Sequence, residues 1–267
     1  MQISGKVAVI TGGARGFGRQ LAAAIVERGG RVVLGDVLAA EGVEAARVLN
    51  SGSKAPVAVF QRCDVTQAAD LEALVARAVS EFGALDIMVN NAGIGGTLPW
   101  TDADHASAAR TIAINLAAPV EGTRLATRYF LHAGRPGCVV NVASMMAFFP
   151  TEFGPVYGAT KSGIVNFTAA CATLAARSPP VRVNAVAPNF AATAMVDELA
   201  REVIPSGSNV LGAGGILTVD EVVAQMLRCI EDESLAGDTI KLLPGRPPLV
   251  HTGRKAADIG ILASAKL

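Results

Sequence analysis

The sequence has few histidines and cysteines, and none of them are grouped. Among 267 residues there are three histidines and four cysteines, namely His105, His132, His251, Cys63, Cys138, Cys171 and Cys229. No CxxC pair or zinc-ligand spacing is present, which disfavours a metal site or a histidine-based catalytic triad. Three of the cysteines lie in apolar runs, where a buried free thiol is the ordinary interpretation. We therefore expect a reduced, cytoplasmic protein without a metal.

The sequence also lacks net charge and long hydrophobic runs. Lysine plus arginine and aspartate plus glutamate are both 23, so the formal net charge is zero. This balance gives no indication of binding to nucleic acid or to an anionic membrane. Hydrophobic residues make up 51% of the chain, but no run reaches the roughly 18 apolar residues of a membrane-spanning helix. The first residues show no signal-peptide pattern.

What the sequence does contain is a regular alternation of short apolar runs with helical patterns. The runs, rich in Val and Ile, lie at 7–11, 31–36, 57–64, 85–93, 138–144, 181–188 and 238–245. They lack polar–apolar alternation, as is typical of strands buried on both faces. The alternation predicts an α/β fold with a parallel sheet covered by helices on both faces. Because no linker divides the chain, we expect one doubly wound domain over 1–267.

One connection is longer than the others. The segment at 189–219 contains Gly and Ser at 206–208 and further glycines at 212, 214 and 215. Long connections at the carboxyl edge of such a sheet usually cover a ligand, so we predict a substrate lid here. A surface insertion without function is the alternative.

A glycine-rich turn follows the first predicted strand. In TGGARGFG, Gly12, Gly16 and Gly18 have the spacing GxxxGxG. Glycines allow a tight turn and let the backbone approach a pyrophosphate at a helix N-terminus. The turn lies between a strand and a helical pattern, and an acidic residue, Asp36, ends the second strand. This combination predicts a dinucleotide site.

The acidic residue indicates which dinucleotide binds. The Asp36 carboxylate would accept hydrogen bonds from a ribose diol and would repel a 2′-phosphate by about 1–4 kcal/mol. We therefore favour NAD over NADP. Arg15 argues for NADP, since a cation in this loop can contact a 2′-phosphate; a solvated surface charge is its other interpretation. Asp64, at the end of the third strand, is placed to contact the adenine edge or simply to form a turn.

The sequence YGATK places Tyr157 and Lys161 four residues apart, on the same face of a helix. A free phenol has a pKa of about 10 and is a poor base. An ammonium about 4 Å away, at an effective dielectric of about 20, is worth about 4 kcal/mol, or about three pKa units. Lys161 is thus expected to bring the pKa of Tyr157 towards neutral pH. On spacing alone, a packed tyrosine beside a snorkelling lysine would be favoured.

Neighbouring segments favour the catalytic interpretation. NVASMM brings Ser144 to the end of the fifth predicted strand, and NNAG at 90–93 ends the fourth. Ligands of open α/β sheets bind at this carboxyl edge. TGGARGFG, NNAG, Asn115, Ser144 and YGATK together resemble the short-chain dehydrogenases/reductases, over about residues 6–245.

This resemblance implies a Rossmann-like, seven-stranded parallel sheet of order 3-2-1-4-5-6-7. It also implies hydride transfer between a nicotinamide and an alcohol or carbonyl, by a homodimer or homotetramer. Tyr157 would be the acid/base, Ser144 would hydrogen-bond the substrate oxygen, Lys161 would bind the ribose and Asn115 would anchor a proton-relay water. The predicted cofactor contacts are Gly12, Arg15, Gly16, Phe17, Gly18, Asp36, Val37, Asp64, Val65, Asn91, Ala92, Gly93, Tyr157, Lys161, Pro188 and Thr193.

The residues themselves support the role of Asn115. Pro119 has no N–H and cannot bond to the carbonyl of Asn115, four residues earlier. A freed carbonyl beside a kink is a natural water site. We predict that it holds a water that reaches Lys161. The alternative is a proline that merely begins a new helical segment.

Several stretches, such as EFGALDIMVNNAGI, resemble the hydroxyprostaglandin dehydrogenase branch of the family, which implies NAD-dependent oxidation of secondary alcohols. Two positions depart from it: Gly154 replaces a substrate-binding glutamine, and Asn189 replaces the glycine after Pro188. Prostaglandins are therefore disfavoured as substrates. Predicted substrate contacts are Ser144, Met145, Met146, Phe153, Asn189, Phe190 and Met195, with Phe148 and Phe149 as further candidates. We expect about half of the methionines and phenylalanines in this set to face substrate.

These residues suggest an apolar secondary alcohol or ketone. Two alternatives stay open: an NADP-dependent carbonyl reductase, and a cofactor-sensing binding protein that has lost turnover.

Overall fold

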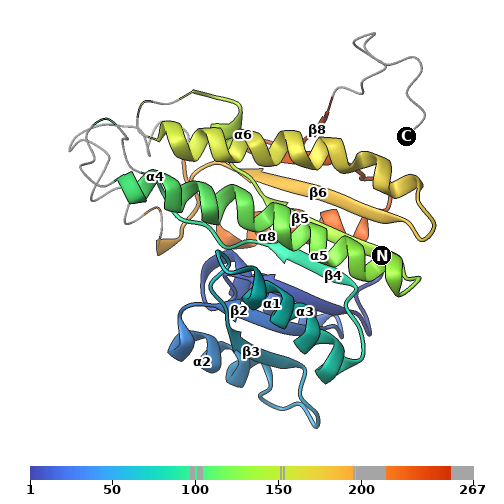
Figure 1. The fold of residues 1–267 in the computed structure, drawn as a ribbon. Helices are drawn as coiled ribbons and strands as arrows, with labels where there is room; N and C mark the ends of the chain where they lie inside the picture. The colour runs from blue at the N-terminus through green and yellow to red at the C-terminus, as the bar shows by residue number, and fades with distance from the viewer. Residues whose placement is uncertain are drawn as a thin grey trace.

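The sheet observed in the structure is the predicted one, with one strand added at its edge. The computed structural model describes residues 1–96, 100, 105–150, 152, 154–194, 196 and 215–253. Within these ranges the strands follow the order β3-β2-β1-β4-β5-β6-β7-β8 (Figure 1). They are β1 (Val7–Thr11), β2 (Arg31–Asp36), β3 (Ala58–Arg62), β4 (Ile87–Asn90), β5 (Gly137–Val142), β6 (Val181–Pro188), β7 (Asp238–Leu242) and β8 (Leu249–Thr252).

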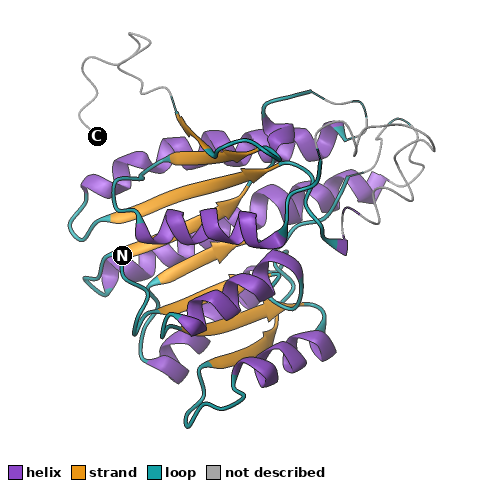
Figure 2. Cartoon of the chain, turned by 180° about the vertical axis from the view of Figure 1, so that it is seen from behind, coloured by secondary structure: helices purple, strands orange, loops and turns teal. Residues whose placement is uncertain are grey.

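Helices cover both faces of the sheet (Figures 1 and 2). They are α1 (Gly16–Glu27), α2 (Ala39–Leu49), α3 (Ala68–Phe82), α4 (His105–Ile112), α5 (Ala118–His132), α6 (Pro155–Ala170) and α8 (Val219–Glu231). A π-helical turn (Ala113–Ala117) joins α4 to α5, and 3-10 turns lie at Met145–Ala147 and Cys171–Ala176. The predicted helical pattern around Pro119 is thus one continuous helix with a π-turn.

The prediction of a wholly parallel, seven-stranded sheet is wrong in one detail. β1 to β7 pair in parallel, but β8 pairs antiparallel with β7. The chain reverses after β7 at Gly245, whose φ of 65° is in the left-handed region, and this lets 249–252 return along the β7 edge. The short segment LVHT follows two prolines and carries too weak a strand pattern to have been predicted.

Alternate side chains of each strand enter two different cores, as the uniform apolar runs require. Ile10, Leu34 and Val140 pack with α1, α2 and α8 on one face. Val9 and Val139 pack with α3 and α5 on the other. This two-sided burial fixes the strand ends at one edge of the sheet, and that edge carries the site.

Polar side chains are buried between the second face and the helices that carry the site. The Asn90 amide donates to Asn141 Oδ1 at 2.8 Å, to Thr123 Oγ1 at 3.1 Å and to the Pro119 carbonyl at 3.2 Å. The Asn141 amide in turn donates to Thr168 Oγ1 at 3.1 Å. Adjacent strands β4 and β5 are thereby fixed to α5 and α6, since a buried amide must find partners.

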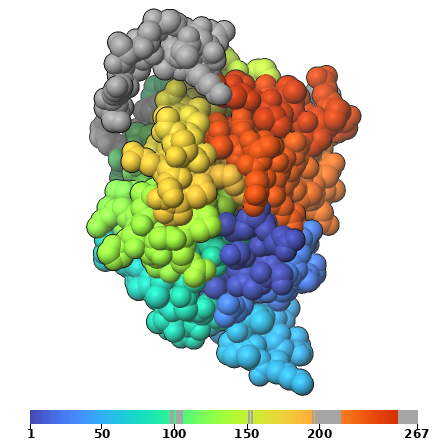
Figure 3. Space-filling view, turned by 90° about the vertical axis from the view of Figure 1, so that its right-hand side faces the viewer, coloured from blue at the N-terminus to red at the C-terminus, as the bar shows by residue number. Residues whose placement is uncertain are grey.

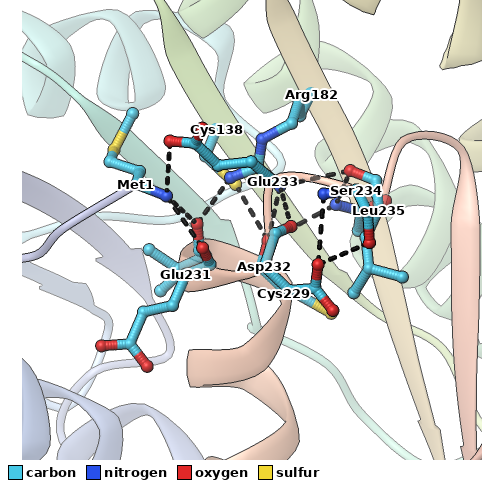
Figure 4. Close-up of polar contacts among 11 residues, drawn as sticks. Met1, Cys138, Arg182, Cys229, Glu231, Asp232, Glu233, Ser234 and Leu235 are labelled. Carbon is cyan, nitrogen blue, oxygen red and sulfur yellow. Dashed lines mark hydrogen bonds and ion pairs between the residues drawn. The ribbon is translucent and has the colours of Figure 1, made fainter.

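Two cations terminate α8 (Figure 4). The Arg182 guanidinium donates to the carbonyls of Cys229 at 2.9 Å and Asp232 at 3.0 Å. The amino group of Met1 donates to the Glu231 carbonyl at 3.0 Å. Both groups satisfy carbonyls that a helix end leaves unpaired, and they also favour the negative end of its dipole.

The N-terminal segment of the chain lies beside α8. Figure 3 shows the surface of the N-terminal segment beside that of the last helix and strands, and Gln20 donates to Asp220 at 2.8 Å across this boundary. No helix in the described ranges is long and apolar enough to span a membrane. Phe153, Met195 and most of the predicted lid lie outside the described residues, as does the chain from 254 onward.

Candidate active site

A cavity of about 920 Å³ lies at the carboxyl edge of the sheet and is lined from β1, β2, β3, β4, β5 and β6. This volume suits a ligand site. The cavity lies at β1, between β2 and β4, and the helices that follow these two strands cover opposite faces of the sheet. The predicted cofactor residues that line it are Gly12, Arg15, Gly16, Phe17, Asp36, Val37, Asp64, Val65, Asn91, Ala92, Gly93, Tyr157, Lys161, Pro188 and Thr193. The fold has therefore gathered residues from most of the chain into one place.

The glycine loop is compact because its neighbours leave no room for side chains. Gly12 has a φ of 64°, and Gly16 one of 56°. A Cβ on Gly18 would lie 2.2 Å from the Gly12 carbonyl oxygen, so Gly18 packs behind the loop and does not itself line the cavity. The Asn91 amide holds the loop from β4, donating to the carbonyls of Thr11 and Gly12 at 2.9 Å each. The loop thus opens α1 with its backbone exposed to the cavity, which fits a pyrophosphate.

The Asp36 carboxylate is held in place before any ligand binds. One oxygen accepts from the Ala14 N–H at 3.0 Å and the other from the Leu38 N–H at 3.1 Å. Its side chain is nearly buried yet lines the cavity, whereas the neighbouring Arg15 is exposed. Carboxylate oxygens have further lone pairs available, and they fit a ribose diol.

Asp64 shows the turn-forming role that was one of its two interpretations. Its carboxylate accepts from the N–H of Thr66 at 3.0 Å and from its hydroxyl at 2.8 Å. These hydrogen bonds, with Arg62 and Arg110 nearby, lower the pKa of Asp64. The residue also lines the cavity, so turn formation and ligand contact are compatible.

Ser144, Tyr157 and Lys161 come together beyond the end of β5. Ser144 caps the 3-10 turn, accepting from the Met146 N–H at 3.2 Å, and it hydrogen-bonds Tyr157. Lys161 is buried; its Nζ donates to the Val142 carbonyl at 2.7 Å and lies 5.5 Å from the centroid of the Tyr157 ring. Phenol and ammonium therefore share one helical face, as the spacing predicted.

The pKa of Tyr157 shifts in the opposite direction to the one expected from its spacing with Lys161. Burial raises the pKa of Tyr157, and the hydrogen bond with Ser144 offsets this only in part. Burial also lowers the pKa of Lys161 to about 8. The expectation that Lys161 by itself brings the phenol towards neutral pH is thus wrong in direction for the protein alone. The reason is that desolvation penalises both charged forms, the phenolate and the ammonium.

Asn115 lies behind the cavity wall, fully buried in the π-helical turn. Its amide donates to the Ile94 carbonyl at 2.8 Å, and its Oδ1 accepts from the Ile94 N–H at 2.9 Å. The side chain thus holds the loop after β4. Pro119 still supplies no N–H four residues on, and the water held by the Asn115 carbonyl stays a prediction.

The predicted substrate residues are partly brought together. Met145, Met146, Phe149, Asn189 and Phe190 line the cavity with Ser144. Phe148 does not: its ring packs edge-on against His251, with centroids 5.0 Å apart, beside Lys241. It follows the 3-10 turn and faces the β7–β8 side of the sheet. Phe153 and Met195 lie outside the described residues.

Several other residues that line the cavity were not predicted from the sequence. Ile94 and Gly96 come from the loop after β4, and Arg110 and Ile114 from the helix before and within the π-turn. Their types carry no motif, and Arg110 and Ile114 reach the cavity because α4 and the π-turn pack against α6. The only available signal was the position of Ile94 and Gly96 directly after NNAG.

Comparisons with known proteins agree with this geometry. A family model described as short chain dehydrogenase matches residues 6–203. The chain is 32% identical over 253 residues to 15-hydroxyprostaglandin dehydrogenase (NAD(+)) of Homo sapiens, covering 91% of this chain and 92% of that protein. It is 40% identical over 200 residues to cis-4-hydroxycyclohexanecarboxylate dehydrogenase of Sinomonas cyclohexanicum, covering 74% and 78%. The crystal structure of levodione reductase superposes with a TM-score of 0.82 at 25% identity, covering 91% and 97%.

Proposed function

The chain belongs to the short chain dehydrogenase family, and we propose that it interconverts an apolar secondary alcohol and its ketone with NAD. Family membership makes it an oxidoreductase that uses a nicotinamide cofactor. The choice of NAD, the roles of individual residues and the substrate class are the proposal. The observation that carries it is the convergence of Ser144, Tyr157 and Lys161 on a cavity that begins at the glycine loop.

The choice of NAD rests on Asp36. Two backbone N–H groups orient its carboxylate, so the negative charge is fixed where the adenosine ribose of a dinucleotide would lie. A 2′-phosphate there would meet like charge a few Å away. The names of relatives such as 15-hydroxyprostaglandin dehydrogenase (NAD(+)) point the same way.

NAD bound in this cavity would supply a nicotinamide ring able to accept a hydride from the carbinol carbon, and in its reduced form able to return that hydride to the carbonyl carbon. Ser144 holds the substrate oxygen by a hydrogen bond. Tyr157 moves the proton: its phenolic oxygen takes the hydroxyl proton during oxidation and gives it back to the carbonyl oxygen during reduction. Because burial raises its pKa, Tyr157 is protonated at neutral pH and ready to act as the acid.

Lys161 is the residue placed to help Tyr157 act as a base. Its ammonium, 5.5 Å from the phenol ring, is the buried cation on the same helical face. When charged, it favours the phenolate that oxidation needs. It also lies beside the cavity where a ribose hydroxyl would accept its hydrogen bond.

The walls near Ser144 favour an apolar substrate. Met145, Met146 and Phe190 are long or aromatic side chains, and methionine adapts its shape to irregular ligands. Gly154 also lines the cavity, and as a glycine it contributes no polar side chain there. An alicyclic or aliphatic secondary alcohol fits this surface better than one with several polar groups.

Two other functions stay open. An NADP-dependent carbonyl reductase is favoured by the exposed Arg15 beside Asp36. A cofactor-sensing protein without turnover is disfavoured by the complete set of Ser144, Tyr157 and Lys161. The deciding experiment is a panel of secondary alcohols and ketones with NAD and NADP, followed by absorbance of the reduced cofactor. Turnover only with NADP refutes the assignment of NAD, and no turnover with either cofactor refutes the proposed reaction.

Assembly and location also belong to the proposal. We expect a homodimer or homotetramer in the cytoplasm, as is usual in this family. Light scattering coupled to size exclusion measures the first, and cell fractionation the second. A monomer at micromolar concentration would contradict the expected assembly.

A further inference from the structure

Gly96 lies in the loop after β4 and packs against the start of α6. A Cβ built on Gly96 would lie 3.1 Å from the Cβ of Tyr157 and 3.3 Å from its backbone nitrogen. These distances are below the roughly 3.5–4.0 Å of an optimal contact between heavy atoms. Both atoms are fixed by the first turn of α6, so neither can swing aside as a side-chain end can. A side chain at 96 therefore presses on the part of the helix that carries the phenol.

Two nearby glycines are in a different situation. A Cβ on Gly95 would meet nothing within 4 Å. A Cβ on Gly154 would approach the Cε of Met146 at 3.0 Å, a flexible side-chain end, and the Cβ of Tyr157 at an ordinary 3.6 Å. None of the three glycines has a positive φ, so left-handed backbone does not explain why they are glycines. Of the three, only Gly96 lies so close to fixed atoms of a helix that a side chain would clash with them.

Hydrogen bonds restrain the loop after β4 from moving away from α6. Its residue Ile94 makes two hydrogen bonds, of 2.8 and 2.9 Å, with the buried amide of Asn115. The Thr111 hydroxyl also lies 3.5 Å from the Gly95 carbonyl. Because the loop is attached at Ile94 and at Gly95 to the helix that runs through the π-turn, part of any displacement caused at 96 must be taken up by Tyr157.

We propose that Gly96 is a positioning residue: its missing side chain lets the Asn115-held loop set where the phenolic oxygen of Tyr157 lies relative to the substrate. This inference rests on the proposed role of Tyr157 as acid/base. Gly96 does not touch the reacting atoms and acts only through Tyr157. The part of the site that binds the adenosine half of the dinucleotide is formed by other residues and is unaffected.

The test is the substitution Gly96→Ala, compared with Gly95→Ala as a matched control in the same loop. Misplacement of a reacting group by a fraction of an ångström to 1 Å costs on the order of 10- to 100-fold in rate. We expect Gly96→Ala to lower kcat by about that factor, with the dissociation constant for NAD within about threefold of the wild-type value. Gly95→Ala should keep kcat within about threefold.

A readout specific to proton transfer separates positioning from loss of structure. If Tyr157 is displaced, proton transfer becomes more rate-limiting, so the solvent deuterium isotope effect on kcat should increase in Gly96→Ala and stay unchanged in Gly95→Ala. If Gly96→Ala yields too little folded protein, Asn115→Asp is the second variant. It keeps the acceptor for the Ile94 N–H but removes the donor to the Ile94 carbonyl, and it should raise the same isotope effect.

The possible results separate this inference from the proposed function. Wild-type kcat and isotope effect in Gly96→Ala, with Tyr157→Phe inactive, overturn only the positioning role. Equal losses in Gly95→Ala and Gly96→Ala also overturn it, since they indicate general loop damage. Full activity of Tyr157→Phe overturns both the role of Tyr157 and that of Gly96.

Discussion

The Nζ of Lys161 donates a 2.7 Å hydrogen bond to the carbonyl of Val142, at the last residue of β5. The same nitrogen lies 5.5 Å from the centroid of the Tyr157 ring. A strand end is thus connected to the helical face that carries the phenol. This hydrogen bond holds the Lys161 ammonium in a buried position, and burying the charge lowers the free energy of unfolding.

We predict that the cost of burying Lys161 depends on pH. Its folded-state pKa is about 8, below the unfolded value of about 10.4. Between these two pKa values the unfolded chain binds more protons than the folded chain, so the free energy of unfolding rises with pH through this window. Below about pH 8, burying the charged ammonium lowers the free energy of unfolding by the full amount of about 3 kcal/mol. Urea unfolding of wild type and Lys161→Met should therefore show a difference in free energy that shifts in favour of the wild type from pH 8 to 10.

Loss of the hydrogen bond to Val142 makes Lys161→Met less stable by a pH-independent amount, so the slope rather than the offset is the test. Lys54→Met, at an exposed lysine, serves as the control. A difference that does not vary with pH would contradict the buried ammonium.

Tyr157→Phe should abolish turnover and leave cofactor binding intact. Removing one oxygen removes the acid/base, which is worth about 10²–10⁴ in kcat. The chain has only one other tyrosine, Tyr129 in α5, whose ring packs against Phe130. Tyr129→Phe is therefore the matched control and should retain activity. Steady-state rates and titration of NAD by calorimetry measure the two effects, and equal rates for both variants would refute the mechanism.

Asp36→Asn should weaken the preference for NAD. The amide oxygen can still accept one backbone N–H bond, but the negative charge is lost. Removing a repulsion of about 1–4 kcal/mol raises the ratio of kcat/KM for NADP over NAD by about 5- to 900-fold. The control is Asp70→Asn, at a carboxylate that accepts from the Asp64 N–H and does not line the cavity. An unchanged ratio would place the ribose away from Asp36.

Asn141→Leu should destabilise the protein by about 2–4 kcal/mol, because it leaves the Asn90 amide and the Thr168 hydroxyl short of a partner in the core. Adding Thr168→Val removes one of these unsatisfied groups. The double variant should then lose less stability than the sum of the single variants. Chemical denaturation of the three variants measures this, and strict additivity would contradict the network.

The four cysteines should be unreactive in the folded protein. Burial raises the pKa of Cys63 to about 12 and also raises the pKa of Cys138, Cys171 and Cys229. The thiolate is the reactive form, so N-ethylmaleimide at neutral pH should leave activity unchanged. The same treatment in urea should label all four. Rapid inactivation of the native enzyme would identify an accessible thiol at the site.

Much of the site could be predicted because its signals are local. The glycines of TGGARGFG and the four-residue spacing of Tyr157 and Lys161 act within one turn or one helical face, where periodicity decides which side chains are neighbours. The seven runs of Val and Ile predicted the parallel strands for the same reason. A carboxylate at the end of a strand, Asp36, needs no more than its position to reach the cavity.

The rest was decided by tertiary packing. The sequence by itself determined where the phenol and the ammonium stand along the helix, but desolvation in the folded site determined that the pKa of Tyr157 rises and that of Lys161 falls. Only the fold brings Asn115 onto Ile94 and Gly96 onto Tyr157, and only the reversal at Gly245 adds β8. Burial and contact depend on residues distant in the chain, and no local pattern encodes those distances.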